Sequence, residues 1–97
     1  MYQAIVTKYI GPSNVRGSRV KATAAAGSIT LHWDSALNPE QNHTAAARAL
    51  ALKFGWVAEY RGGGMPDNGG YAFVATDPRD TMPSFAITAV DVAAAAA

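Results

Sequence analysis

Basic side chains gather in one short part of the sequence, and binding of phosphate or carboxylate groups is the chemistry they could perform. Four of the eight lysine and arginine residues lie within residues 8–21, a stretch without an acidic residue. On a strand, Arg19 and Lys21 would share a face at a spacing of roughly 7 Å. The candidate partner-binding residues are Lys8, Asn14, Arg16, Ser18, Arg19 and Lys21. The structural alternative is an ordinary solvated sheet face with loop charges.

A glycine-rich segment at residues 62–70 is the second candidate, with five glycines in nine positions. It contains neither the GxxxxGK[ST] pattern nor a GxGxxG placed between a strand and a helix, so a phosphate cradle is not indicated. Its flanks resemble strands, and its Asp-Asn-Gly sequence is typical of a turn. We therefore interpret the segment as a hairpin loop, with Met65, Asp67 and Asn68 as a secondary contact loop for a partner.

Two histidines and a carboxylate form the third candidate: His32, Asp34 and His43. Such side chains can ligate zinc or transfer protons. Their spacing matches no metal or catalytic motif, and the pattern places His32 on the polar face of a strand and His43 in the first turns of a helix. We expect structural or solvated histidines, with no metal, cofactor or catalytic residue. A small enzyme that uses His32 and His43 is the least favoured alternative.

The aromatic residues are mostly expected in the core, because alternation places them on apolar strand faces. This set comprises Trp33, Trp56, Tyr60, Tyr71 and Phe73. The alternative is a base-stacking platform on the open face of the sheet, for which Tyr9 and Tyr60 are the best members.

One long helix is expected at residues 39–54, between the strands that carry these candidates. Asn38 can cap its start, Pro39 suits the first helical position, and Gln41 completes a capping box. Gly55 can end the helix in a left-handed conformation.

Alternation of apolar and polar residues predicts five strands, two of them in a hairpin with one wet face. These strands cover residues 2–10, 19–25, 28–34, 56–61 and 71–75. Residues 85–92 could form a sixth strand. The order β-β-β-α-β-β, with or without a last strand, predicts an α+β fold with one antiparallel sheet and the helix packed on one face. Residues 1–92 would form a single domain, and residues 93–97 an alanine tail that is either frayed or a short helical extension.

Composition excludes several classes of protein. The 97 residues carry a net charge of +1, which excludes an acidic nucleic-acid mimic and a globally basic coat protein. The chain has no cysteine, so disulfide scaffolds and thiolate sites are excluded, and a reducing cytoplasm is the expected location. Neither a signal peptide nor an apolar run long enough to span a membrane is evident.

Several stretches resemble a family of small proteobacterial proteins found on plasmids, integrated elements and phages. These stretches are TKYIGPSNVRGSRVKA at residues 7–22, WDSALN at 33–38, Asn42-His43 and KFGW at 53–56. The resemblance covers about residues 2–75. The family has no established activity, so the resemblance implies no catalytic residue. It implies a mobile-element setting, in which small single-domain proteins act as accessory factors or as inhibitors of host defence.

Together these observations favour a non-catalytic interaction module that binds a macromolecular partner through its basic loop and strand. The expected partner is a protein or a protein–nucleic-acid complex, such as a host-defence or nucleic-acid-processing complex that the module inhibits in an anti-CRISPR-like manner. The first alternative is a protein that binds nucleic acid directly.

Overall fold

An antiparallel sheet wraps around one long helix in the computed structural model, which describes residues 3–13, 17–66, 70–76 and 85–96. The strands are β1 (Ile5–Ile10), β2 (Arg19–Ala24), β3 (Gly27–His32), β4 (Ala58–Gly64), β5 (Tyr71–Thr76) and β6 (Phe85–Ile87). The helices are α1 (Pro39–Lys53) and α2 (Ala89–Ala96).

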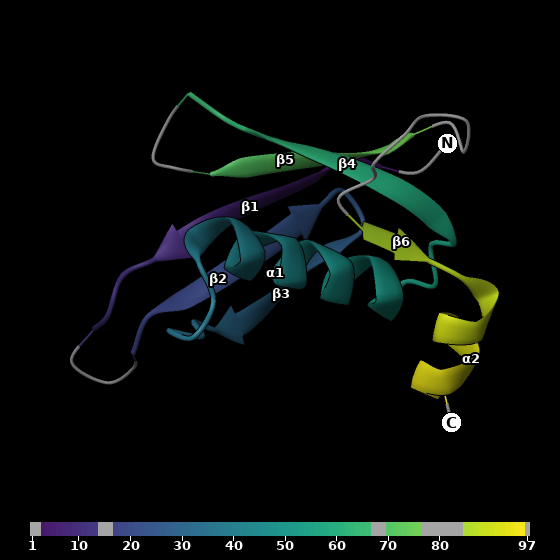
Figure 1. Ribbon diagram of the computed structural model, residues 1–97, viewed down its shortest axis with the longest axis horizontal. Coiled ribbons are helices and arrows are strands. Elements are labelled where there is room, and N and C mark those ends of the chain that lie inside the picture. Colours follow the sequence, from purple (N-terminus) through teal and green to yellow (C-terminus); the bar gives the residue numbers. More distant parts are fainter. Residues whose placement is uncertain (1–2, 14–16, 67–69, 77–84, 97) are drawn as a thin grey trace.

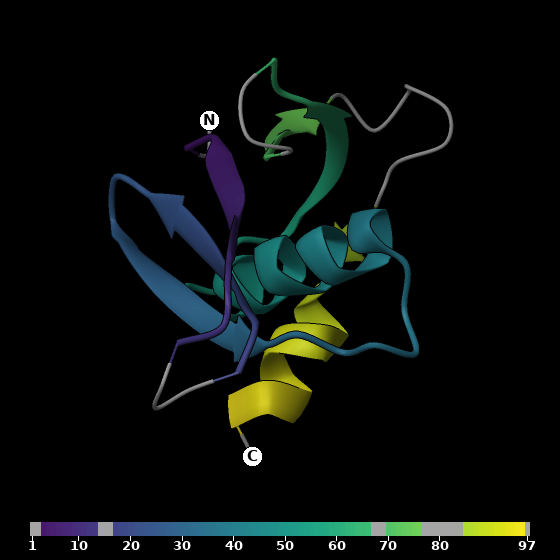
Figure 2. The same ribbon diagram turned by 90° about the vertical axis from the view of Figure 1, so that its left-hand side faces the viewer.

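The strand order across the sheet is β3-β2-β1-β5-β4-β6, and all neighbours are antiparallel. The sheet curls around α1, so the helix lies in its concave face (Figure 2). Over the described part of the chain, no helix covers the convex face. The prediction of an α+β fold, with an antiparallel sheet and a long helix on one face, is confirmed.

Alternating side chains explain why one face of the sheet is buried and the other is wet. In β2, Val20 and Ala22 are buried on the concave side, whereas Arg19, Lys21 and Thr23 lie on the convex side. Helix α1 packs against β1, β2, β3 and β6. It therefore supports the strands that carry the basic residues.

Both ends of α1 follow from local sequence. The Asn38 side chain accepts a hydrogen bond of 2.8 Å from the Gln41 backbone N–H, and the Asn38 backbone N–H donates one of 3.0 Å to the Gln41 side chain. This is the predicted capping box. At the other end, Gly55 adopts a φ of 67°, a left-handed conformation that glycine adopts without steric cost.

The core is built from few large side chains. Within α1, the fully buried apolar residues are Ala46, Ala47, Leu50 and Ala51. Because three of the four are alanine, the helix can lie close to the sheet. The large side chains come chiefly from the strands, including Ile5, Tyr60 and Phe73.

The glycine-rich segment corrects one prediction, because its first three residues belong to a strand rather than to a loop. Gly62, Gly63 and Gly64 lie in β4, opposite Phe73, Ala72 and Tyr71 of β5. The Phe73 ring lies over Gly62 and occupies the space that a side chain would need. Glycine at this position is therefore a packing requirement and not a turn signal.

The possible strand at residues 85–92 is also corrected, because only its first three residues form β6, which pairs with β4. A cap at Thr88 starts α2. The Asp91 side chain accepts bonds of 2.9 Å from the backbone N–H and the hydroxyl of Thr88, and the Asp91 N–H donates one of 3.2 Å to that hydroxyl. The backbone bond from Thr88 is the main cause of the lowered pKa of Asp91. Residues 93–96, all alanine, continue as helix, which their high helix propensity favours.

Candidate partner-binding site

Basic side chains from three adjacent strands meet on the convex face of the sheet. Lys8 in β1 lies directly opposite Lys21 in β2, and Arg19 in β2 lies opposite His32 in β3. Alternation puts all four side chains on the side away from α1. We call these four residues the basic face.

The lysines of the basic face form a like-charge pair. Directly opposite residues of an antiparallel pair have Cβ atoms about 5 Å apart, and like charges at that distance are destabilising. Strands β1, β2 and β3 contain no acidic residue, and none of the described carboxylates forms an ion pair with Lys8, Arg19 or Lys21. The Arg19 Nε atom is buried and has no hydrogen-bond partner among the described residues. The face therefore holds positive charge that this part of the chain leaves uncompensated.

Ser18 lies directly before β2, and its hydrogen bonds join neighbouring strands. Its hydroxyl shares a hydrogen bond of 2.9 Å with the Tyr9 hydroxyl, and its carbonyl accepts a bond of 3.0 Å from the Trp33 N–H. Ser18 thus ties the start of β2 to β1 and to the end of β3, and it supports the basic face without belonging to it. Asn14 and Arg16, the other predicted loop residues, lie outside the described residues.

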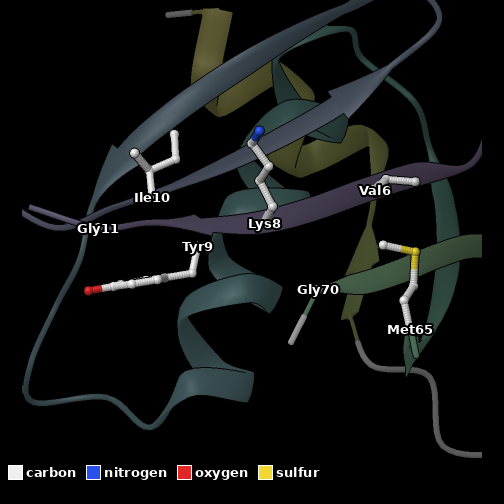
Figure 3. Close-up of a pocket in the computed structure, with 7 residues that line it drawn as sticks. All are labelled: Val6, Lys8, Tyr9, Ile10, Gly11, Met65 and Gly70. Carbon is white, nitrogen blue, oxygen red and sulfur yellow. The ribbon is translucent and has the colours of Figure 1, made fainter. Parts of the chain in front are cut away.

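Met65 borders a hollow of about 560 Å³ between β1 and the β4–β5 hairpin (Figure 3). Val6, Lys8 and Ile10 line the same hollow, so the structure brings Met65 near one member of the basic face. The other residues of the predicted secondary contact loop, Asp67 and Asn68, lie outside the described residues.

The base-stacking platform, which was the alternative to core packing, is not formed by the described residues. Tyr60 is fully buried and stacks on Phe85 at a centroid distance of 4.8 Å. Tyr9 lies on the same face of β1 as the buried Ile5, where its ring meets Trp33 edge-on. Among the described residues, no aromatic side chain belongs to the convex face of strands β1 to β5. Trp33, Trp56 and Tyr71 pack against the core, as the alternation predicted.

The two histidines lie on opposite sides of the sheet. His32 is exposed on the convex face, whereas His43 is 2% exposed beneath the concave face. His43 Nδ1 and Thr7 Oγ1 share a hydrogen bond of 2.7 Å, and the His43 ring packs against Tyr71 and Trp33. The pair therefore does not form the shared site that the enzyme alternative requires.

Asp34 stabilises the turn between β3 and α1 through hydrogen bonds. Its side chain accepts a hydrogen bond of 2.9 Å from the Ala36 N–H, and its backbone N–H and carbonyl both bond the buried Asn42 side chain at 2.9 Å. No group of three or more potential metal ligands occurs in the described ranges. Asn42 and Thr7 are buried polar residues that the sequence did not reveal, because their partners lie in other elements.

Burial of His43 makes the stability of the fold depend on pH. Desolvation lowers the pKa of His43 below its ordinary value of 6.5. The unfolded chain therefore binds a proton as the pH falls below about 6.5, whereas the folded chain does so only at lower pH. We expect the free energy of unfolding to fall on acidification from about pH 7.5 to about pH 5, as measured by urea denaturation.

Matched histidine variants test this assignment. In His43→Gln, the free energy of unfolding should fall less on acidification, because the buried imidazole is absent. In His32→Gln, it should fall as much as in the wild type. An unchanged pH dependence in His43→Gln would show that protonation of His43 is not linked to folding.

Neither helix described by the structure is long and apolar enough to cross a membrane. Comparison with protein-family models, with curated proteins and with solved structures finds no match.

Proposed function

We propose that the protein is a non-catalytic interaction module that binds an acidic surface of a macromolecular partner through the basic face. The observation that carries the proposal is the cross-strand pair of Lys8 and Lys21 on an uncovered sheet face without a compensating carboxylate among the described residues. A like-charge pair costs the sheet stability. Carboxylates of a partner would remove that cost on binding and would steer the encounter.

The surroundings of the basic face favour a protein partner over a nucleic acid. Val6 and Val74 are 40% and 48% exposed on the convex face, so apolar surface lies beside the charges. A mixture of apolar and charged groups is typical of protein interfaces. Single-stranded nucleic acids are instead bound largely through aromatic stacking, which the described convex face does not offer. In the mobile-element setting that the resemblance implies, the partner would belong to a host-defence or nucleic-acid-processing complex.

Reversal of one charge tests this proposal without loss of the fold. Lys21→Glu places a carboxylate opposite Lys8, and opposite charges at such a position contribute roughly 0.2–1 kcal/mol to sheet stability. We expect an equal or higher melting temperature, together with at least about tenfold weaker capture of the partner from a bacterial lysate. A purely structural lysine would instead leave capture unchanged.

Arg61→Glu is the matched control, because it makes the same charge change on the exposed convex side of β4. It should retain partner capture, since β5 separates β4 from β1. If both variants lost capture of the partner equally, binding would depend on the net charge of the protein and not on the basic face. Loss of the captured species on nuclease treatment, with a steep decrease of binding as salt rises, would replace the proposal by direct binding of nucleic acid.

A further inference from the structure

Strand β1 loses one of its two neighbours halfway along its length. Residues 6–10 pair with β2, but the pairing with β5 ends where Thr7 meets Tyr71. Beyond this point β1 and the β4–β5 hairpin diverge (Figure 1). Among the described residues, residues 8–10 therefore have a strand neighbour on one side only.

The hollow of about 560 Å³ lies where the two segments diverge (Figure 3). Val6 and residues 8–10 of β1, with the following Gly11, line one side, and Met65 and Gly70 line the other. Lys8 and Tyr9 point to opposite sides of β1 (Figure 3). Among the described residues, the hollow thus combines a strand edge without a pairing partner, a lysine on one side of that strand and an aromatic ring on the other.

We infer that an extended acidic segment of the partner protein enters this gap and adds a strand beside residues 8–10. The inference rests on the proposed function and specifies how the partner is held. Backbone hydrogen bonds to an exposed edge give affinity in this mode of recognition, and alternate side chains give specificity. An added strand would place an acidic side chain beside Lys8 and an apolar one beside Tyr9.

Charge complementarity favours an acidic segment of a partner over a second copy of this chain as the strand that fills the gap. An acidic residue beside Lys8 would lie within reach of Lys21, which is the cross-strand partner of Lys8. A second copy of this chain that paired through the same edge would bring its own Lys8 and Lys21 close to this pair, and the repulsion would oppose dimer formation. The gap is also short: Tyr71 closes one end, and Pro12, which has no backbone N–H to donate, follows the other.

The probe is a short capped peptide in which glutamate and valine alternate. We expect it to bind the wild-type protein and to slow hydrogen exchange of the outward-facing amides within residues 8–11. A peptide with the same side chains but N-methylated at alternate residues should bind at least about tenfold more weakly, because it cannot complete the ladder. A lysine–valine peptide should bind equally weakly.

The outcomes separate this inference from the proposed function. Equal binding of the methylated and unmethylated peptides, or no binding of either, would overturn the added strand, whereas the proposed function would stand as long as Lys21→Glu loses the partner. Protection of residues 8–11 without peptide, together with a concentration-dependent dimer, would assign the edge to a second copy. Retention of the partner by Lys21→Glu would instead overturn the proposed function itself.

Discussion

Alanine in place of Gly62 is expected to destabilise the fold by about 3 kcal/mol, in the upper part of the range for overpacked cores. An added Cβ would come closer than 3.0 Å to Cε1 and Cδ1 of Phe73. The Phe73 ring is 1% exposed and lies among the rings of Tyr71 and Phe85. It therefore cannot move aside without disturbing the core.

Gly63→Ala provides the matched control, because it makes the same chemical change one residue further along β4. Nothing lies within 4 Å of a Cβ built at Gly63. Urea denaturation of the two variants should show a large loss of stability for position 62 and nearly none for position 63. Equal effects would mean that the backbone preference of glycine, and not the contact with Phe73, determines the cost.

The sequence was sufficient to predict which faces of β2 and β3 are buried. In a strand that alternates strictly, the apolar side chains all lie on one face, and that face packs against the helix. Val20 and Ala22 are buried as alternation requires, and Arg19 and Lys21 lie on the other face. The limits of α1 could be predicted for a similar reason, since the Asn38 cap and the Gly55 terminator act through residues near them in the chain. For these elements the causes lie within the segment itself, and local signals were sufficient.

Predictions failed where contacts distant in sequence decide the structure. Glycines at residues 62–64 normally signal a loop, yet Phe73 from the next strand makes them part of a sheet. The three residues of β6 are too few for alternation to define, and their pairing with β4 is a tertiary contact. The end of β6 is the exception, because the cap that Thr88 and Asp91 form at the start of α2 is a local signal that the predicted strand at residues 85–92 did not take into account.

The candidate site shows the same division. The concentration of basic residues was visible in the sequence, and so was the face shared by Arg19 and Lys21. The position of Lys8 opposite Lys21 depends on register, which a shift of one residue would have changed. The gap beside β1 depends on the place where β5 begins, at Tyr71. Neither the register of Lys8 and Lys21 nor the gap beside β1 can be recognised from the sequence of a single strand.

Truncation of Leu50 is expected to cost about 4 kcal/mol of stability, toward the high end for leucine-to-alanine changes in cores. Leu50 is 0% exposed, and the other fully buried apolar residues of α1 are alanines. Small neighbours cannot extend into the space left by the leucine, so the cavity should persist. Leu50→Met, which roughly conserves volume, should cost less than about 1.5 kcal/mol. A negligible loss of stability in Leu50→Ala would indicate that α1 does not contact the sheet through this side chain.

The same variant separates a scaffold role from a role in binding. Helix α1 packs against the concave side of β1 and β2, whereas the basic face lies on their convex side. Well below its melting temperature, Leu50→Ala should therefore capture the partner nearly as well as the wild type. Lys21→Glu should show the reverse behaviour, with its stability kept and its binding lost. Loss of binding by folded Leu50→Ala would instead mean that the partner also contacts α1.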